Sequence, residues 1–151
     1  MAGSVTAAVR SDPECAESLS QCSMTLRMTR ETFLMDTDLR SAGVQDGLVV
    51  VVKSSCETCQ TVVPVLADLA DRADLTVYTQ DDPAFPVVAD WVFDDTDLAT
   101  SWRLDLETVP TLLRIADGIE ADRVVGWDRD RWEEVARVDG LGPDLPPFRP
   151  G

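Results

Sequence analysis

The chain has 151 residues, and 28 acidic against 13 basic side chains give it a formal net charge of −15 at pH 7. This length is enough to bury one core, so we expect one domain with extensions that folds without disulfides. The negative charge argues against binding to nucleic acid or to an anionic membrane surface, and the absence of histidine excludes Cys-His and Ser-His catalysis.

The N-terminal part of the chain gives weak structural signals. Residues 1–30 are polar and poorly periodic, so we expect them to form an N-terminal extension. A short strand over Thr32–Leu34 and a short helix ending at Val44 would then open a domain that spans residues 31–140.

The middle of the chain alternates between strand and helix patterns. The continuous apolar run Leu48–Val52 predicts a strand buried on both faces. Gln60–Ala70 has apolar residues at helical spacing and predicts a helix, and Leu75–Thr79 alternates as a strand does. Asp81–Phe93 contains two prolines and is expected to be a loop, whereas Asp94–Leu104 is expected to be a helix.

The last third of the chain predicts a hairpin and a closing helix. Thr111–Ile115 and Arg123–Val125 would be antiparallel strands around a turn at Asp117–Gly118. Asp128–Val138 predicts a helix, and residues 141–151, rich in glycine and proline, predict an extended C-terminal tail. Together these elements indicate an α/β fold with a mixed central sheet and helices on both faces.

Two cysteines, Cys56 and Cys59, flank Glu57-Thr58 where the buried strand meets the first helix. Thiols three residues apart at a helix start can close into a small disulfide ring. The free backbone N–H groups at that helix start favour the thiolate of Cys56, which is the reactive form of cysteine. The pattern therefore predicts a dithiol that cycles between reduced and oxidised states.

Three motifs in a fixed order make the chain similar to the thioredoxin-like family over roughly Thr32 to Val138. The first is CxxC at the strand-to-helix turn. The second is Pro64, eight residues after Cys56, where the family places a proline that kinks the helix. The third is Val109-Pro110-Thr111, which matches the family's cis-proline segment and is followed, after the hairpin, by Gly126.

The resemblance implies a thioredoxin-like fold in which Cys56 attacks a substrate disulfide and Cys59 resolves the mixed disulfide. It also implies a cis peptide bond before Pro110, beside the dithiol, where the backbone of Val109 could pair with a bound peptide. Trp127 could form one wall of the substrate groove. The expected substrate-binding residues are Ser55, Glu57, Thr58, Val109, Pro110, Gly126 and Trp127.

Several positions depart from the typical thioredoxin pattern. Ser55 stands where thioredoxins have tryptophan, and Glu57-Thr58 stands where they have Gly-Pro. Val50 occupies the position of the family's buried carboxylate, so the group that takes the proton of the resolving thiol is open. Glu57 would oppose the helix field, and Lys53 could either offset that charge or extend into solvent.

The other two cysteines, Cys15 and Cys22, lie outside the resemblance. Seven residues on a continuous helix span about 10.5 Å, which is too far for a disulfide. Inert thiols are the expected case, while a second redox disulfide in an irregular segment and a zinc site shared with Cys56 and Cys59 stay open.

We therefore expect a thiol–disulfide oxidoreductase that reduces a protein or a low-molecular-weight disulfide and takes electrons from an unidentified donor. The alternative is a thioredoxin-fold binding or regulatory module with a redox-sensitive dithiol. No cofactor and no resident metal are expected. Residues 1–10 lack a secretory signal pattern, and no run approaches the roughly 18 apolar residues of a membrane span, so a cytoplasmic location is expected.

Overall fold

The computed structural model describes residues 38–151, so the strand expected at Thr32–Leu34 lies outside the described residues. Residues 39–151 form one compact unit. In chain order its elements are β1 (Gly47–Val52), α2 (Glu57–Thr61), α3 (Val63–Arg72), β2 (Leu75–Thr79), β3 (Val92–Asp94), α4 (Ala99–Arg103), β4 (Thr111–Ala116), β5 (Ile119–Val125), β6 (Trp127–Asp128), α5 (Arg129–Ala136) and β7 (Phe148–Arg149).

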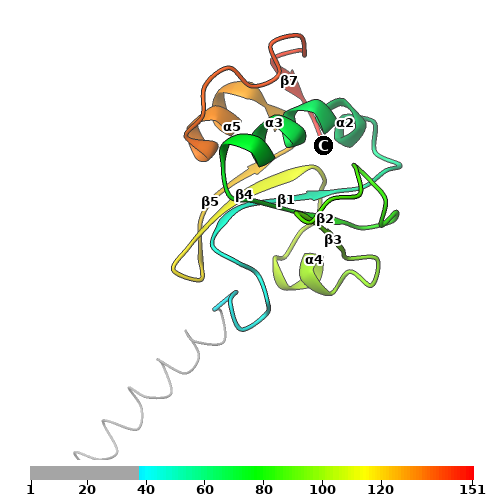
Figure 1. Ribbon diagram of the computed structural model, residues 1–151, viewed down its shortest axis with the longest axis vertical. Helices are drawn as coiled ribbons and strands as arrows, with labels where there is room; N and C mark the ends of the chain where they lie inside the picture. Colours follow the sequence, from blue (N-terminus) through cyan, green and yellow to red (C-terminus); the bar gives the residue numbers. More distant parts are fainter. Residues whose placement is uncertain (1–37) are drawn as a thin grey trace, which may run out of the picture. The chain divides into compact units, whose positions relative to one another are not determined.

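A five-stranded mixed sheet forms the centre of the unit, with the strand order β3-β2-β1-β4-β5 (Figure 1). β1 and β2 are parallel, as are β2 and β3, whereas β4 runs antiparallel to both β1 and β5. The predicted hairpin around Asp117–Gly118 is confirmed as the connection between β4 and β5.

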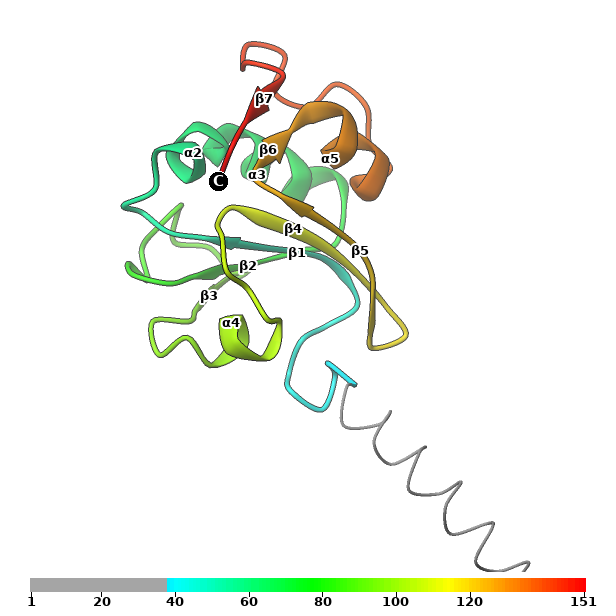
Figure 2. The ribbon, with the colours of Figure 1, turned by 180° about the vertical axis from the view of Figure 1, so that it is seen from behind.

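Strand β1 is buried on both faces, as the sequence predicts. Val50 and Val52 pack into a core with residues of α3 and α5, whereas Val49 and Val51 pack into a second core with Leu104, next to α4. In the two opposite views, α3 and α5 lie on one side of the sheet and α4 on the other (Figure 1, Figure 2). The expected α/β class, a mixed sheet with helices on both faces, is therefore confirmed.

The helix expected from Gln60 to Ala70 consists of two helices. α2 ends at Thr61, α3 begins at Val63, and Val62 lies between them. Pro64 lies in the first turn of α3. Backbone N–H groups in a first turn have no partner within the helix, so proline, which lacks an N–H, costs no hydrogen bond there. The break therefore falls where the sequence places its proline.

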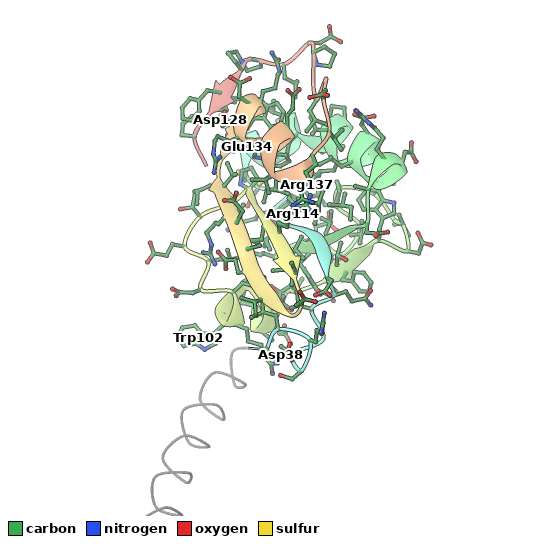
Figure 3. The ribbon with its side chains drawn as sticks, turned by 90° about the vertical axis from the view of Figure 1, so that its left-hand side faces the viewer. Asp38, Trp102, Arg114, Asp128, Glu134 and Arg137 are labelled. Carbon is green, nitrogen blue, oxygen red and sulfur yellow. The ribbon has the colours of Figure 1, made fainter. Side chains whose placement is uncertain are left out.

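The helix expected over Asp94–Leu104 is wrong in its first half. Asp94 ends β3, and its carboxylate accepts the backbone N–H of Thr96 at 2.8 Å, which favours a turn over a helix. Only α4 is helical, and Trp102 on it is 85% exposed and points away from the sheet (Figure 3).

The helix expected to end at Val44 is also wrong in its described part. Residues 39–43 form turns, in which Gly43 donates its N–H to the Arg40 carbonyl and has a positive φ of 83°. That conformation suits glycine and does not continue a right-handed helix.

Residues 141–151, expected as an extended tail, fold back onto the domain. Leu141 is fully buried in the core beside α5, and β7 pairs antiparallel with β6. The guanidinium of Arg129 donates hydrogen bonds to the carbonyls of Leu141, Gly142 and Leu145. In the described part of the chain, no helix is long and apolar enough to cross a membrane.

Candidate functional site

The dithiol lies where β1 leaves the sheet and α2 begins. Cys56 is the N-cap residue of α2 and is half-buried, whereas Cys59, one turn later, is completely buried. Both are free thiols, and the backbone N–H of Cys59 donates to the Sγ of Cys56 at 3.4 Å. A backbone N–H aimed at sulfur is the type of donor that stabilises a thiolate.

The two thiols differ in their electrostatic surroundings. Burial raises the pKa of the Cys59 thiol well above its ordinary value, and its hydrogen-bonding contact with Cys56 raises this pKa further. Cys59 is therefore protonated at neutral pH and shielded from solvent. Of the two cysteines, only Cys56 is partly accessible to solvent, and its sulfur is the one that accepts a backbone N–H.

We predict that iodoacetamide modifies Cys56 before Cys59 in the reduced protein near neutral pH. The thiolate is the species that reacts, and Cys59 is both buried and protonated. Mass spectrometry of peptides after timed alkylation measures the order of labelling. Faster modification of Cys59 would overturn the assignment of Cys56 as the nucleophile.

The loop before Cys56 is fixed by a residue that the sequence analysis did not place in the site. The carboxylate of Asp81 accepts the N–H groups of Ser54 and Ser55, at 2.7 and 3.1 Å, and the Ser54 hydroxyl at 3.0 Å. Burial acts to raise the pKa of Asp81, but these hydrogen bonds outweigh it and hold the pKa below its usual value. Asp81 follows β2, which is parallel to β1, so the carboxyl ends of the two strands meet at this edge.

Glu57 and Thr58, between the two cysteines, both contact residues near the end of the described chain. The side chain of Glu57 is 87% exposed, and its carboxylate lies 3.5 Å from the guanidinium of Arg149. Thr58 is buried, and its hydroxyl donates to the carbonyl of Pro150 at 2.7 Å. The charge of Glu57 is thus met by Arg149, a pairing that local sequence could not reveal.

The Val109–Pro110 segment lies beside the dithiol. The peptide bond before Pro110 is cis, the isomer that the resemblance implies. The thiol of Cys56 donates to the carbonyl of Val109 at 3.5 Å, and the Pro110 carbonyl accepts the N–H of Gly126 at 2.7 Å. Val109 therefore contacts Cys56 directly, and a backbone hydrogen bond joins the next residue, Pro110, to Gly126.

Trp127 does not line an open groove in this structure. It is fully buried, its indole N–H donates to the carbonyl of Pro146 at 2.7 Å, and its ring packs edge-to-face against Trp132 at 5.1 Å between centroids. The chain from Pro146 onward covers the position where the sequence analysis expected a groove wall.

Val50 lies in the same core as Cys59 and is completely buried. Its strand neighbours in register are Val77 and Leu112, so the surroundings of this position are apolar. The carboxylate of Asp81 lies near enough for its charge to add slightly to the rise in the Cys59 pKa that burial causes. The side chain at position 50 therefore cannot accept the proton that the Cys59 thiol must lose.

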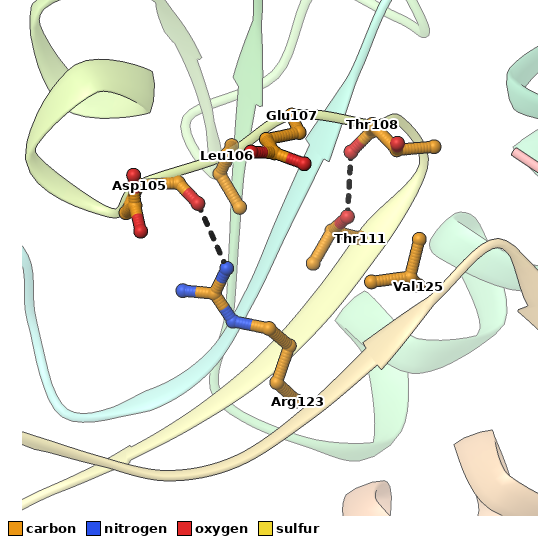
Figure 4. Close-up of a pocket in the computed structure, with 7 residues that line it drawn as sticks. All are labelled: Asp105, Leu106, Glu107, Thr108, Thr111, Arg123 and Val125. Atoms are coloured by element: carbon orange, nitrogen blue, oxygen red, sulfur yellow. Dashed lines mark hydrogen bonds between the residues drawn. The ribbon is translucent and has the colours of Figure 1, made fainter.

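A hollow of about 360 Å³ lies between the loop that precedes β4 and the strands β4 and β5 (Figure 4). Arg123 donates to the Asp105 carbonyl at 3.0 Å, and the Thr111 hydroxyl donates to the Thr108 carbonyl at 2.6 Å, so polar groups of its lining satisfy one another. Its lining is Asp105, Leu106, Glu107, Thr108, Thr111, Arg123 and Val125, and it contains neither cysteine of the dithiol.

Cys15 and Cys22 lie outside the described residues, so the alternatives for them stay predictions. Within residues 38–151, no group of three or more His, Cys, Asp or Glu side chains is placed to hold one metal ion.

Comparisons with known proteins give similarities only among solved structures. No protein-family model matches the chain, and no curated protein matches it. A reduced thioredoxin pre-protein from Schistosoma mansoni is 21% identical, with 68% of this chain and 87% of that chain covered and a TM-score of 0.42. A Malassezia sympodialis thioredoxin is 18% identical over 60% and 70% of the two chains, with a TM-score of 0.39. A mutant thioredoxin from Halobacterium salinarum is 27% identical over 66% and 76%, also with a TM-score of 0.39.

Proposed function

We propose, from the premise that residues 39–151 have a thioredoxin-like fold, that this chain is a thiol–disulfide oxidoreductase acting through Cys56 and Cys59. The observation that carries the proposal is the asymmetry of the dithiol. Cys56 is partly exposed and accepts a backbone N–H, whereas Cys59 is buried one turn behind it. This is the arrangement that an attacking thiol and a resolving thiol require.

The proposed reaction begins when the Cys56 thiolate attacks one sulfur of a substrate disulfide. A bond forms between Cys56 and that sulfur, the substrate S–S bond breaks, and the other sulfur leaves as a thiolate that takes up a proton. Cys59 then loses its proton and attacks the sulfur of Cys56, which releases the second substrate thiol. Two electrons have passed to the substrate, and an external dithiol must reduce the resulting Cys56–Cys59 disulfide.

Resolution is the step that the surroundings of this dithiol make demanding. Burial raises the pKa of Cys59, so only a small fraction of this thiol is ionised near neutral pH. The rate of resolution should therefore rise as the pH rises, because deprotonation of Cys59 precedes its attack.

The direct test is reduction of insulin disulfides with dithiothreitol as the electron source. We expect the native protein to accelerate precipitation of the insulin B chain above the rate with dithiothreitol alone. A correctly folded protein that gives no acceleration, with either insulin or a small disulfide, would contradict the enzymatic proposal and favour a binding module with a redox-sensitive dithiol.

The double variant Cys15→Ser/Cys22→Ser is expected to keep most of the activity. These cysteines lie outside the compact unit of residues 39–151 that contains the dithiol. The insulin assay measures the effect, with native protein at equal concentration as the control. A loss beyond about tenfold, or roughly 1.4 kcal/mol in the barrier, would instead indicate a relay between two dithiols.

A further inference from the structure

The segment Pro146–Gly151, which we call the strap, runs along the edge of the fold toward the dithiol. It is held first by the pairing of β7 with β6 and by the hydrogen bond from Trp127 to the Pro146 carbonyl. In both views the chain passes from β7 toward α2 (Figure 1, Figure 2). The strap therefore connects the closing helix region with the helix that carries the cysteines.

The strap lies directly against Gly126. A Cβ atom added to Gly126, which has a φ of 77°, would come within 2.9 Å of both the Arg149 carbonyl oxygen and the Gly151 nitrogen. Backbone therefore touches backbone here, and glycine is the residue that permits this approach. Gly126 is one of the residues expected to bind substrate.

The far end of the strap meets two more of the expected substrate-binding residues. The carbonyl of Pro150 accepts the Thr58 hydroxyl at 2.7 Å. Gly151 is packed so closely that an added Cβ would lie 2.8 Å from the Val109 carbonyl oxygen. That oxygen is the one that accepts the Cys56 thiol, so Gly151 of the strap lies beside the dithiol.

We propose that the strap is a built-in occupant of the substrate-binding edge, so that the protein discriminates between disulfides by size. This inference rests on the proposed function. A folded protein substrate must displace the strap to bring its backbone beside Val109. A small disulfide needs access only to the half-buried Cys56 and no pairing with the backbone of Val109.

The strap is held by hydrogen bonds and one ion pair and buries none of its own side chains, so its release would take no apolar side chain out of the core. The ion pair of Arg149 joins it to the highly exposed Glu57, and exposed ion pairs contribute little. Phe148 is 59% exposed. By contrast, the chain before Pro146 is anchored by the buried Leu141 and by the hydrogen bonds of Arg129. Opening is thus expected to pivot near Pro146.

Thiol accessibility tests the strap without any assumption about catalysis. In the Cys15→Ser/Cys22→Ser background, Cys56 is alkylated by N-ethylmaleimide and, separately, by a maleimide attached to a long polyethylene glycol chain. Arg149→Ala removes the ion pair and the hydrogen bond to Thr61. We expect it to raise the ratio of the large-reagent rate to the small-reagent rate about fivefold, because the open state becomes more populated.

Arg103→Ala is the matched control, since it removes the same charge from exposed α4 and should leave this ratio unchanged. A second variant keeps the number of residues, replaces Phe148–Gly151 with a Gly-Ser-Gly-Ser sequence and should raise the ratio at least as much as Arg149→Ala. If neither variant changes the ratio, the strap does not restrict access to Cys56 and the proposal is overturned.

Measuring the reduction of a protein disulfide and of a small disulfide separates this inference from the proposed function. Arg149→Ala should raise the ratio of the insulin reduction rate to the reduction rate of the small neutral hydroxyethyl disulfide about fivefold, and taking the ratio cancels the effect of the uncompensated Glu57 charge on Cys56. Equal acceleration with both disulfides would overturn size discrimination. If no variant reduces either disulfide, the enzymatic proposal fails, while the alkylation ratios still decide whether the strap covers the dithiol.

Discussion

Cys59→Ser is expected to convert the protein into a covalent trap for its substrate and to lower turnover by about a thousandfold or more. Cys56 keeps its partly exposed sulfur, so the first attack and the mixed disulfide still form. Serine cannot attack that disulfide, so the complex persists. Non-reducing electrophoresis with insulin, followed by mass spectrometry, measures the adduct.

Cys56→Ser is the matched control for the trap. In the Cys15→Ser/Cys22→Ser background it should lose turnover to the same extent but form no adduct, because Cys59 is buried and its pKa is raised. Thermal melting of both variants shows whether they are folded. An adduct that forms through Cys59 in the Cys56→Ser protein would reverse the roles assigned to the two thiols.

Val50→Asp is expected to lower the free energy of unfolding by about 3 kcal/mol or more at neutral pH. Val50 is completely buried between Val77 and Leu112, so a carboxylate there has no partner and its pKa rises in the folded state. An acid whose folded pKa is raised loses stability as the pH rises through that pKa. The deficit relative to native protein should therefore be smallest near the unfolded pKa of about 3.9, where only the cost of burying the uncharged polar group remains, and largest at alkaline pH.

Val50→Asn is the control for this variant, since it has similar size and polarity but no charge. Its deficit in thermal melting should not depend on pH. An equal and pH-independent deficit in both variants would show that the aspartate stays uncharged or reaches water.

The same variant tests proton removal from Cys59. An aspartate in the core that contains Cys59 could accept the thiol proton, so Val50→Asp should resolve a preformed mixed disulfide faster than Val50→Asn. Stopped-flow release of the substrate thiol measures this rate. Resolution by native protein that is fast and flat between about pH 6 and pH 9, around the reference thiol pKa of roughly 8.5, would show that another group already takes the proton.

Local sequence was sufficient for the parts of the fold in which neighbouring residues decide the conformation. Leu48–Val52 is apolar at every position because both faces of β1 are covered. Asp128 caps α5 and accepts the N–H of Arg131, and Trp132 of that helix is buried as its spacing indicates. In these elements propensity and packing favour the same structure.

The parts that sequence reasoning missed depend on contacts between distant positions. β3 is only three residues long and is defined by its parallel pairing with β2. The Asp81 carboxylate accepts a hydrogen bond from Ser54, 27 positions earlier in the sequence. Arg149 forms an ion pair with Glu57, from which most of the sequence of the domain separates it. No local pattern encodes such pairs.

The glycine- and proline-rich composition of residues 141–151 suggested an unattached chain for a related reason. Proline and glycine remove helical and strand periodicity, but they leave backbone carbonyls free to accept hydrogen bonds from elsewhere. The carbonyls of Pro146, Pro147 and Pro150 all do so in this structure.

The burial of Trp127 gives the protein an intrinsic optical signal. An indole surrounded by apolar groups emits at shorter wavelength than one in water, and Trp127 owes part of its shielding to the chain that begins at Pro146. Lifting the chain beyond Pro146 would expose the Trp127 indole to water, while the neighbouring ring of Trp132 stays in the core. Opening of the strap would therefore shift the tryptophan fluorescence to longer wavelength. This shift can be followed in unlabelled protein during turnover.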